Sequence, residues 1–211
     1  MNAATAIAFV VAGVFAALDW TARARNNRRL EIVCKPATLI ALIVAAVALD
    51  PASGADARRA WFVVALVFSL AGDVFLLRDD WFVPGLAAFL VAHVCYIVGF
   101  WTDGPAAAPF AVSIVIVIVI VVPLARRILG ALHDEPKLRP PVAAYIVTIS
   151  VMLATALAVG NPLAAIGAGL FVGSDTMIAW NRFVRPFAAA DVAIMVTYHL
   201  GQALLVASLL R

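Results

Sequence analysis

The sequence predicts an all-α integral membrane protein, a single transmembrane domain of eight spanning helices over residues 1–211. Hydrophobic residues make up 65% of the chain and charged residues only 13%, with a mean hydropathy of +1.07. A soluble domain has about 45–50% apolar and about 25% charged residues. Long apolar stretches follow one another, and short connections between them carry nearly all the charge. This pattern excludes a soluble globule, a disordered chain and a nucleic-acid binder.

Eight stretches fit the roughly 17–25 residues that a spanning helix needs. They cover residues 3–20, 32–49, 60–77, 81–101, 106–125, 141–159, 161–180 and 188–210. The first is not interpreted as a signal peptide, because no Lys or Arg precedes it. Lys35 and Pro36 are predicted to open the second helix, since Pro is tolerated in a first turn. A Gly160-Asn161-Pro162 turn separates the sixth and seventh stretches.

A weak internal repeat accompanies these stretches. The third contains a segment that ends in Gly72-Asp73, and the seventh contains one that ends in Ser174-Asp175. A helix with aromatic residues and a His follows each. This pattern is compatible with a 4+4 parallel repeat about an axis along the membrane normal.

The distribution of basic residues predicts the topology. Connections 1–2, 3–4, 5–6 and 7–8 hold twelve Lys and Arg residues, and the other side holds Arg58, Arg59 and Arg211. The positive-inside rule puts the twelve in the cytoplasm and both termini outside. The net charge of +3 therefore needs no nucleic acid to explain it. Heavy use of Arg, Ala and Val is typical of a high-GC bacterial genome, so we expect a bacterial inner membrane.

Four ionisable side chains stand out because they lie away from the ends of the predicted spans: Asp73, His93, Asp175 and His199. Each costs roughly 2.5–3.5 kcal/mol to insert, which makes such groups functional candidates. At 1.5 Å per residue, Asp73 lies about 6 Å and Asp175 about 8 Å from the cytoplasmic end. The sequence therefore predicts a site in the cytoplasmic half of the bundle.

Each candidate also has a structural interpretation. The two aspartates can act as hydrogen-bonded glue between helices, although their matched depth favours function. His93 is equally compatible with a catalytic and a core role, and His199 is better explained as structural. Lys35 can anchor to lipid or bind a substrate phosphate. Asp19 and Asp191 are placed at helix ends, and Gly169-xxx-Gly173 is typical of close helix packing.

Two carboxyl groups in an apolar cavity suit acid–base chemistry. Burial favours the neutral form and a second carboxylate favours it further, so one acid keeps a proton that it can donate. The sequence lacks Gly-x-Ser-x-Gly and His-Glu-x-x-His, the motifs of serine esterases and zincins. The same residues also fit a His/Asp metal-dependent lipid hydrolase, a proton relay in a transporter or lipid carrier, or a non-catalytic scaffold.

Several motifs together resemble the YhhN-like family, the lysoplasmalogenases. They are Lys35-Pro36, Phe68-Ser69-Leu70-Ala71-Gly72-Asp73, Phe82-x-x-Gly85-Leu86-x-x-Phe89-x-x-Ala92-His93-x-x-Tyr96, Gly167-Ala168-Gly169-Leu170-Phe171-x-x-Ser174-Asp175 with Asn181-Arg182-Phe183, and Thr197-Tyr198-x-x-x-Gln202. The resemblance covers nearly the whole chain. It departs at His199, where the family more often has Tyr, and this lowers the case for a metal site.

The resemblance implies a membrane hydrolase that cleaves the vinyl ether bond of a lysoplasmalogen, a lysophospholipid, to a fatty aldehyde and a glycerophospho-base. Asp73 and Asp175 would be the catalytic pair, and no metal or other cofactor is expected. The substrate-binding residues would be Lys35, Ser69, His93, Tyr96, Ser174, Asn181, Arg182, Tyr198 and Gln202. The substrate and membrane lipid would be its partners, with no nucleic acid.

Overall fold

The computed structural model describes residues 1–102 and 104–210, with residue 79 described by its backbone alone. Within these residues the chain is all-α, as predicted, and contains no strand. Eight long helices are α1 (Ala3–Ala24), α2 (Arg28–Ala48), α3 (Asp56–Phe75), α4 (Phe82–Trp101), α5 (Ala107–Ala131), α6 (Arg139–Ala158), α7 (Pro162–Ala179) and α8 (Ala190–Ala207). Short 3-10 turns occupy Asp79–Trp81, Pro136–Leu138 and Ser208–Leu210, and a π-helical turn occupies Trp180–Val184.

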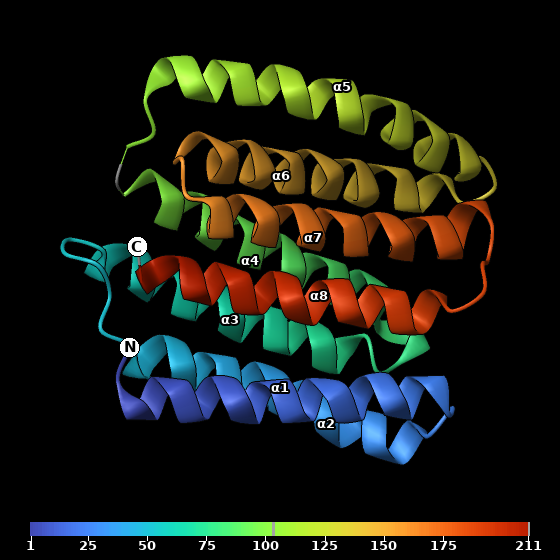
Figure 1. The fold of residues 1–211 in the computed structure, drawn as a ribbon. Coiled ribbons are helices and arrows are strands. Elements are labelled where there is room, and N and C mark those ends of the chain that lie inside the picture. The colour runs from blue at the N-terminus through green and yellow to red at the C-terminus, as the bar shows by residue number, and fades with distance from the viewer. Residues whose placement is uncertain (103, 211) are drawn as a thin grey trace.

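The long helices run side by side, up and down (Figure 1). Around the bundle, α1, α2, α3, α4, α6, α7 and α8 each pack on the next, and α8 closes a ring against α1. α5 lies outside this ring and packs mainly on α6. The ring interior is therefore shielded by helices, and polar groups placed there must find partners on neighbouring helices.

Among the described helices, seven are long and apolar enough to cross a membrane. α3 has a similar length, 20 residues, but begins with Asp56, Arg58 and Arg59 and carries Asp73 near its end. It packs between α2 and α4 along the same bundle. The chain is therefore an α-helical membrane bundle in which α3, with its additional charged residues, packs among the seven candidate spans.

The structure corrects the predicted start of the second helix. α2 begins at Arg28, where the side chain of Asn27 accepts a hydrogen bond from the Leu30 amide at 3.3 Å. Lys35 and Pro36 thus lie two turns inside the helix, and Lys35 is only 3% exposed. The prediction was wrong because an apolar window excludes a charged first turn, whereas a helix can begin with one at the membrane edge.

Close helix packing also differs from the prediction. A Cβ added to Gly169 or Gly173 would meet nothing within 4 Å, so this motif makes no tight contact. Instead α7 and α8 cross at Gly167 and Gly201, where a Cβ on either residue would lie 2.9 Å from the carbonyl oxygen of the other. The backbone-to-backbone approach therefore requires glycine on both helices.

The predicted turn between the sixth and seventh helices is confirmed. Gly160 has φ +71°, a conformation that glycine adopts at little cost. The Asn161 side chain accepts hydrogen bonds from the amides of Leu163 and Ala164 and so caps α7. The possible 4+4 repeat stays a prediction.

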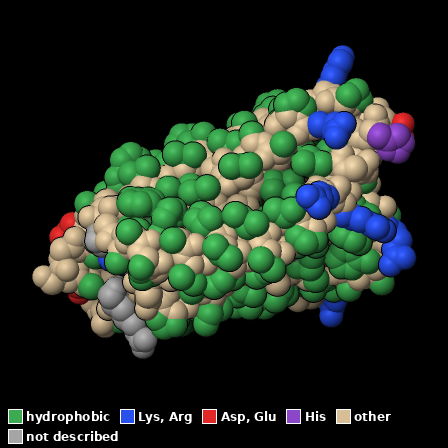
Figure 2. Space-filling view, turned by 90° about the horizontal axis from the view of Figure 1, so that it is seen from above, with side chains coloured by type: hydrophobic (Ala, Val, Ile, Leu, Met, Phe, Trp, Pro, Cys, Tyr) green, Lys and Arg blue, Asp and Glu red, His purple; other side chains and the backbone are tan. Residues whose placement is uncertain are grey.

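Basic side chains gather at one end of the bundle, and a green apolar surface covers its length (Figure 2). This end holds the connections α1–α2, α3–α4, α5–α6 and α7–α8, whereas the N and C ends of the chain lie at the other end (Figure 1). Arg211 falls outside the described residues. The charge asymmetry of the sequence is thus an asymmetry of the folded molecule, and the membrane side it faces stays a prediction.

Replacing Gly167 by Leu should destabilise the protein. The added side chain would strike the α8 backbone at Gly201, and such overpacking typically costs about 1–3 kcal/mol. Gly169→Leu is the matched control on the same helix, because that position is open. Thermal unfolding in detergent should show a lower Tm for Gly167→Leu alone, and equal values for the two variants would contradict the assigned contact.

Reporter fusions should place both termini outside the cytoplasm. A reporter in the 132–138 connection, at the basic end, should give the opposite, cytoplasmic signal, because Lys and Arg are retained on that side. Alkaline phosphatase and green fluorescent protein fusions measure the two states. A cytoplasmic signal from a terminal fusion would invert the topology.

Candidate active site

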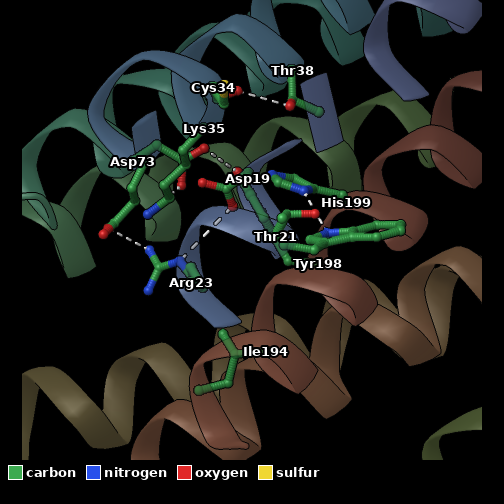
Figure 3. Close-up of polar contacts among 12 residues, drawn as sticks. Asp19, Thr21, Arg23, Cys34, Lys35, Thr38, Asp73, Ile194, Tyr198 and His199 are labelled. Carbon is green, nitrogen blue, oxygen red and sulfur yellow. Dashed lines mark hydrogen bonds and ion pairs between the residues drawn. The ribbon is translucent and has the colours of Figure 1, made fainter. Parts of the chain in front are cut away.

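Asp73 is buried where α2, α3 and α8 meet, with 1% exposure. Its Oδ1 lies 3.1 Å from the Lys35 Nζ, and the Tyr198 hydroxyl donates a hydrogen bond to Oδ2 at 2.9 Å. The early start of α2 explains this contact, because it moves Lys35 from the helix end into the bundle. The interpretation of Lys35 as a lipid anchor is therefore wrong: its ammonium forms a buried ion pair with Asp73 (Figure 3).

Asp175 has a different set of partners, from α4 and α6. The Tyr145 hydroxyl donates a hydrogen bond to its Oδ2, and the His93 Nε2 lies 3.5 Å from the same oxygen. His93 Nε2 also lies 2.9 Å from the Tyr145 hydroxyl oxygen. Asp175 is more open than Asp73, with its side chain 15% exposed. Among the described residues, no Lys or Arg forms an ion pair with it.

The two carboxyl groups line one pocket, which we call the polar pocket, of about 310 Å³. It lies at the basic end of the ring, between α1, α2, α3, α4, α7 and α8. Its charged lining residues are Arg23, Lys35, Asp73, Asp175, Arg182 and Asp191. Both signs of charge therefore face the same space, as expected for a site that binds a charged polar molecule.

A second, apolar pocket adjoins it between α4, α5, α6 and α7; we call it the apolar slot. Its lining is almost wholly hydrophobic, with side chains such as Leu86, Leu124, Ile128, Ile146 and Ile149. The two pockets share Leu76, Phe82, Phe89, Asp175 and Ile178. Asp175 is thus the ionisable residue that lines both the polar pocket and the apolar slot, at their junction.

The structure divides the predicted substrate-binding residues into two groups. Lys35, Ser174, Asn181, Arg182 and Tyr198 line the polar pocket. Within it, the Asn181 side chain accepts a hydrogen bond from the Phe187 amide at 3.2 Å, and the Arg182 guanidinium lies 4.1 Å from the centre of the Phe82 ring. The Ser174 hydroxyl donates to the Ile194 carbonyl at 3.1 Å.

The other predicted residues, Ser69, His93, Tyr96 and Gln202, are buried and line neither pocket. The Tyr96 hydroxyl donates a hydrogen bond to the Gln202 amide oxygen. His93 lies behind Asp175, as described above. These side chains therefore support the walls of the site instead of facing its interior.

Comparison with known proteins identifies the family of this chain. The YhhN family model matches residues 30–209. The chain belongs to the YhhN family. It is 39% identical over 147 residues to the lysoplasmalogenase TMEM86B of Homo sapiens, covering 70% of this chain and 62% of that protein.

Two further relatives cover more of this chain. Identity is 33% over 176 residues to the TMEM86B lysoplasmalogenase of Sus scrofa, which covers 82% of this chain and 72% of that protein. It is 35% over 175 residues to a lysoplasmalogenase of Mycobacterium bovis, which covers 80% and 66%. This chain thus spans less than two thirds of the human relative. No solved structure matches.

Three residues at or near the site were not among the predicted site residues. Tyr145 carried a signal, because the chain has only three tyrosines and each sits within a predicted span; all three are buried and bind a polar side chain. Asp19 and Arg23 lie on α1, outside the YhhN family match. Their spacing of four residues puts them on one helix face, but they were assigned to a helix end and a loop.

Asp19 is fully buried on the α1 face that points toward Lys35 and Asp73 (Figure 3). Its Oδ2 lies 3.8 Å from the Arg23 Nε, and neither carboxyl oxygen has a hydrogen-bond partner among the described residues. Arg23 in turn contacts Glu31 at 2.8 Å and lines the polar pocket. α1 therefore adds an acid and a base to the cluster beyond what the YhhN family match contains.

The second intramembrane histidine has a separate environment. His199 Nδ1 accepts a hydrogen bond from Trp20 Nε1 at 3.1 Å, and the two rings stack with centroids 6.3 Å apart. Among the described residues, no group of three or more His, Cys, Asp or Glu side chains is placed to hold a metal ion. His199 thus packs α8 against α1, as its structural interpretation predicted.

Breaking the Lys35–Asp73 pair should destabilise the protein more than removing it whole. Lys35→Met leaves the Asp73 carboxylate buried without its cation, and such a loss costs about 3–5 kcal/mol. The double variant Lys35→Met/Asp73→Asn removes both charges and should recover part of that loss. Chemical unfolding in mixed micelles measures the coupling.

Lys137→Met is the control for loss of a basic residue, because Lys137 is exposed in the α5–α6 connection. It should leave unfolding unchanged. Strict additivity of the Lys35 and Asp73 substitutions would show that the two side chains do not interact.

Proposed function

We propose that this protein is a membrane hydrolase that cleaves the vinyl ether bond of a lysoplasmalogen by acid–base catalysis with Asp73 and Asp175. One observation carries the proposal: the two carboxyl groups face the same pocket, and one of them stands where that pocket meets an apolar slot. The names of the YhhN-family relatives support the substrate. The site lies at the basic end, which we assign to the cytoplasmic half of a bacterial inner membrane.

A lysophospholipid fits the two pockets by its two halves. The phosphate and glycerol occupy the polar pocket, where Arg23 and Arg182 offer guanidinium groups suited to a phosphate. The hydrocarbon chain occupies the apolar slot. The vinyl ether, which joins glycerol to chain, then lies at the junction beside Asp175.

The partners of the two acids assign their roles. Lys35 is a cation that favours the ionised carboxylate of Asp73, and the Tyr198 hydroxyl adds a donor. Asp175 has Tyr145 and His93 as partners, and both can be neutral. Asp175 is therefore the proton donor, and Asp73 is the carboxylate that stabilises positive charge and activates water.

Asp73 and Asp175 together can carry out every proton transfer of the reaction. Asp175 gives its proton to the β-carbon of the vinyl ether, which leaves an oxocarbenium ion. Asp73 takes a proton from water as the oxygen adds to that cation, and a hemiacetal forms. Asp73 then returns the proton to the departing glycerol oxygen while Asp175 takes the hemiacetal hydroxyl proton. Aldehyde and alcohol leave, and both acids regain their starting states without a metal or organic cofactor.

Aldehyde release from a lysoplasmalogen by the purified protein in lipid nanodiscs tests this function. The wild type should release fatty aldehyde, in EDTA as in its absence. The saturated alkyl ether analogue should not react, because it has no double bond to protonate. Asp73→Asn and Asp175→Asn should each lower kcat at least about 10²-fold, and the double variant should cost little more.

Asp134→Asn supplies the control for loss of a carboxylate, because Asp134 is exposed and pairs only with His133 at 2.9 Å among the described residues. It should retain full activity. Full activity of Asp73→Asn, or transport of the lysolipid without cleavage, would overturn the hydrolase.

A further inference from the structure

Two buried side chains form a hydrogen-bonded chain behind Asp175, the proposed proton donor. His93 on α4 contacts Tyr145 on α6, and Tyr145 contacts Asp175 on α7. The His93 and Tyr145 rings meet edge to face with centroids 5.2 Å apart, and Phe171 packs on the other side of the imidazole at 4.8 Å. His93 has 0% exposure and Tyr145 7%. The chain is therefore held by packing and is shielded from water.

The direction of the hydrogen bonds along this chain follows from the single hydroxyl proton of tyrosine. Tyr145 gives that proton to Asp175 Oδ2, so its oxygen can only accept from His93. His93 must then carry its proton on Nε2, which leaves Nδ1 bare. Nδ1 is the ring nitrogen that has no partner among the described residues, and a bare nitrogen there avoids a buried N–H donor without an acceptor.

We propose that Tyr145, oriented by His93, is a positioning residue that determines which oxygen of Asp175 carries the catalytic proton. Tyr145 donates to Oδ2, and the His93 Nε2 lies 3.5 Å from the same oxygen. A proton on Oδ2 would face the hydroxyl proton of Tyr145, so the acid proton resides on Oδ1. This inference rests on the proposed function and deepens it, since it names the atom that protonates the substrate.

The location of Tyr145 relates this arrangement to the proposed reaction. Tyr145 and Asp175 both line the apolar slot, whereas His93 lines neither pocket. Tyr145 thus fixes the carboxyl group from the slot side while Oδ1 remains available at the junction of the pockets. A carboxyl group without this contact would rotate and present its proton in several directions, which lowers the rate without weakening substrate binding.

Tyr145→Phe is the direct test, because it removes the hydroxyl and keeps the ring. The variant should lose up to about 10²-fold in kcat with an unchanged KM for the lysoplasmalogen. Thr155→Val is the control on α6: it also removes a buried hydroxyl, but one that bonds the carbonyls of Val151 and Met152 in its own helix. It should match the wild type in kcat and KM.

A second pair of variants tests the role of His93. Gln at this position can donate an N–H to the Tyr145 oxygen, whereas Leu cannot. His93→Gln should therefore keep a higher kcat than His93→Leu at equal KM. Equal losses in the two variants, or a Tyr145→Phe protein with wild-type kcat, would overturn the proposal even if aldehyde release is observed.

An infrared measurement tests the same contact without turnover. The C=O band of protonated Asp175 is assigned by its absence in Asp175→Asn. It should move to higher wavenumber in Tyr145→Phe, because Oδ2 loses a hydrogen-bond donor, and it should stay in place in Thr155→Val. A band that does not move refutes the positioning role. Failure of the wild type to release aldehyde, with the band shift observed, would refute the hydrolase function and leave the contact standing.

Discussion

The ion pair between Lys35 and Asp73 is the contact on which the architecture of the site depends. It joins α2 to α3, and the Tyr198 hydroxyl on the same carboxylate adds α8. Both charges are almost fully buried, and removing them from water carries a cost of several kcal/mol per ion. That cost is met only when the two groups meet, so the pair requires one register between these helices. Lys35 and Asp73 both line the polar pocket, so this register also sets the position of its wall.

The two aspartates have partners of the same kinds but of different charge. Each accepts a hydrogen bond from a tyrosine, and each lies near a nitrogen base. For Asp73 the nitrogen belongs to the amino group of Lys35, whereas for Asp175 it belongs to the imidazole of His93. The two acids thus differ both in exposure and in the groups that contact them, a difference by which two-carboxylate catalysis can assign one acid and one base.

The fold and the two central acids could be predicted from the sequence because each depends on a local signal. Apolar length indicates a spanning helix, and an Asp within such a length is costly enough to indicate function. The ends of the helices were harder to predict, because charged turns such as the start of α2 are helical but lie outside the apolar stretch. For this reason the burial of Lys35 was not predicted. The contacts of Tyr145 and Asp19 depend on which helices are neighbours. The residue pattern of a single helix does not contain that information. The prediction of close packing at Gly169 and Gly173 was wrong for the same reason. The close contact is at Gly167, because Gly201 lies opposite it on α8.

The charged character of α3 bears on how the chain enters the bilayer. α3 is the long described helix that is not among the seven candidate spans; it carries Asp56, Arg58 and Arg59 at its start, and Asp73 adds the cost of a carboxyl group near the basic end of the bundle. The cation that neutralises it lies on α2, the helix synthesised immediately before. α2 and α3 can therefore partition into lipid as one hairpin in which Lys35 and Asp73 are already paired. The Lys35–Asp73 ion pair would then also favour the insertion of α3, a helix with several charged residues, before the remaining helices have been synthesised.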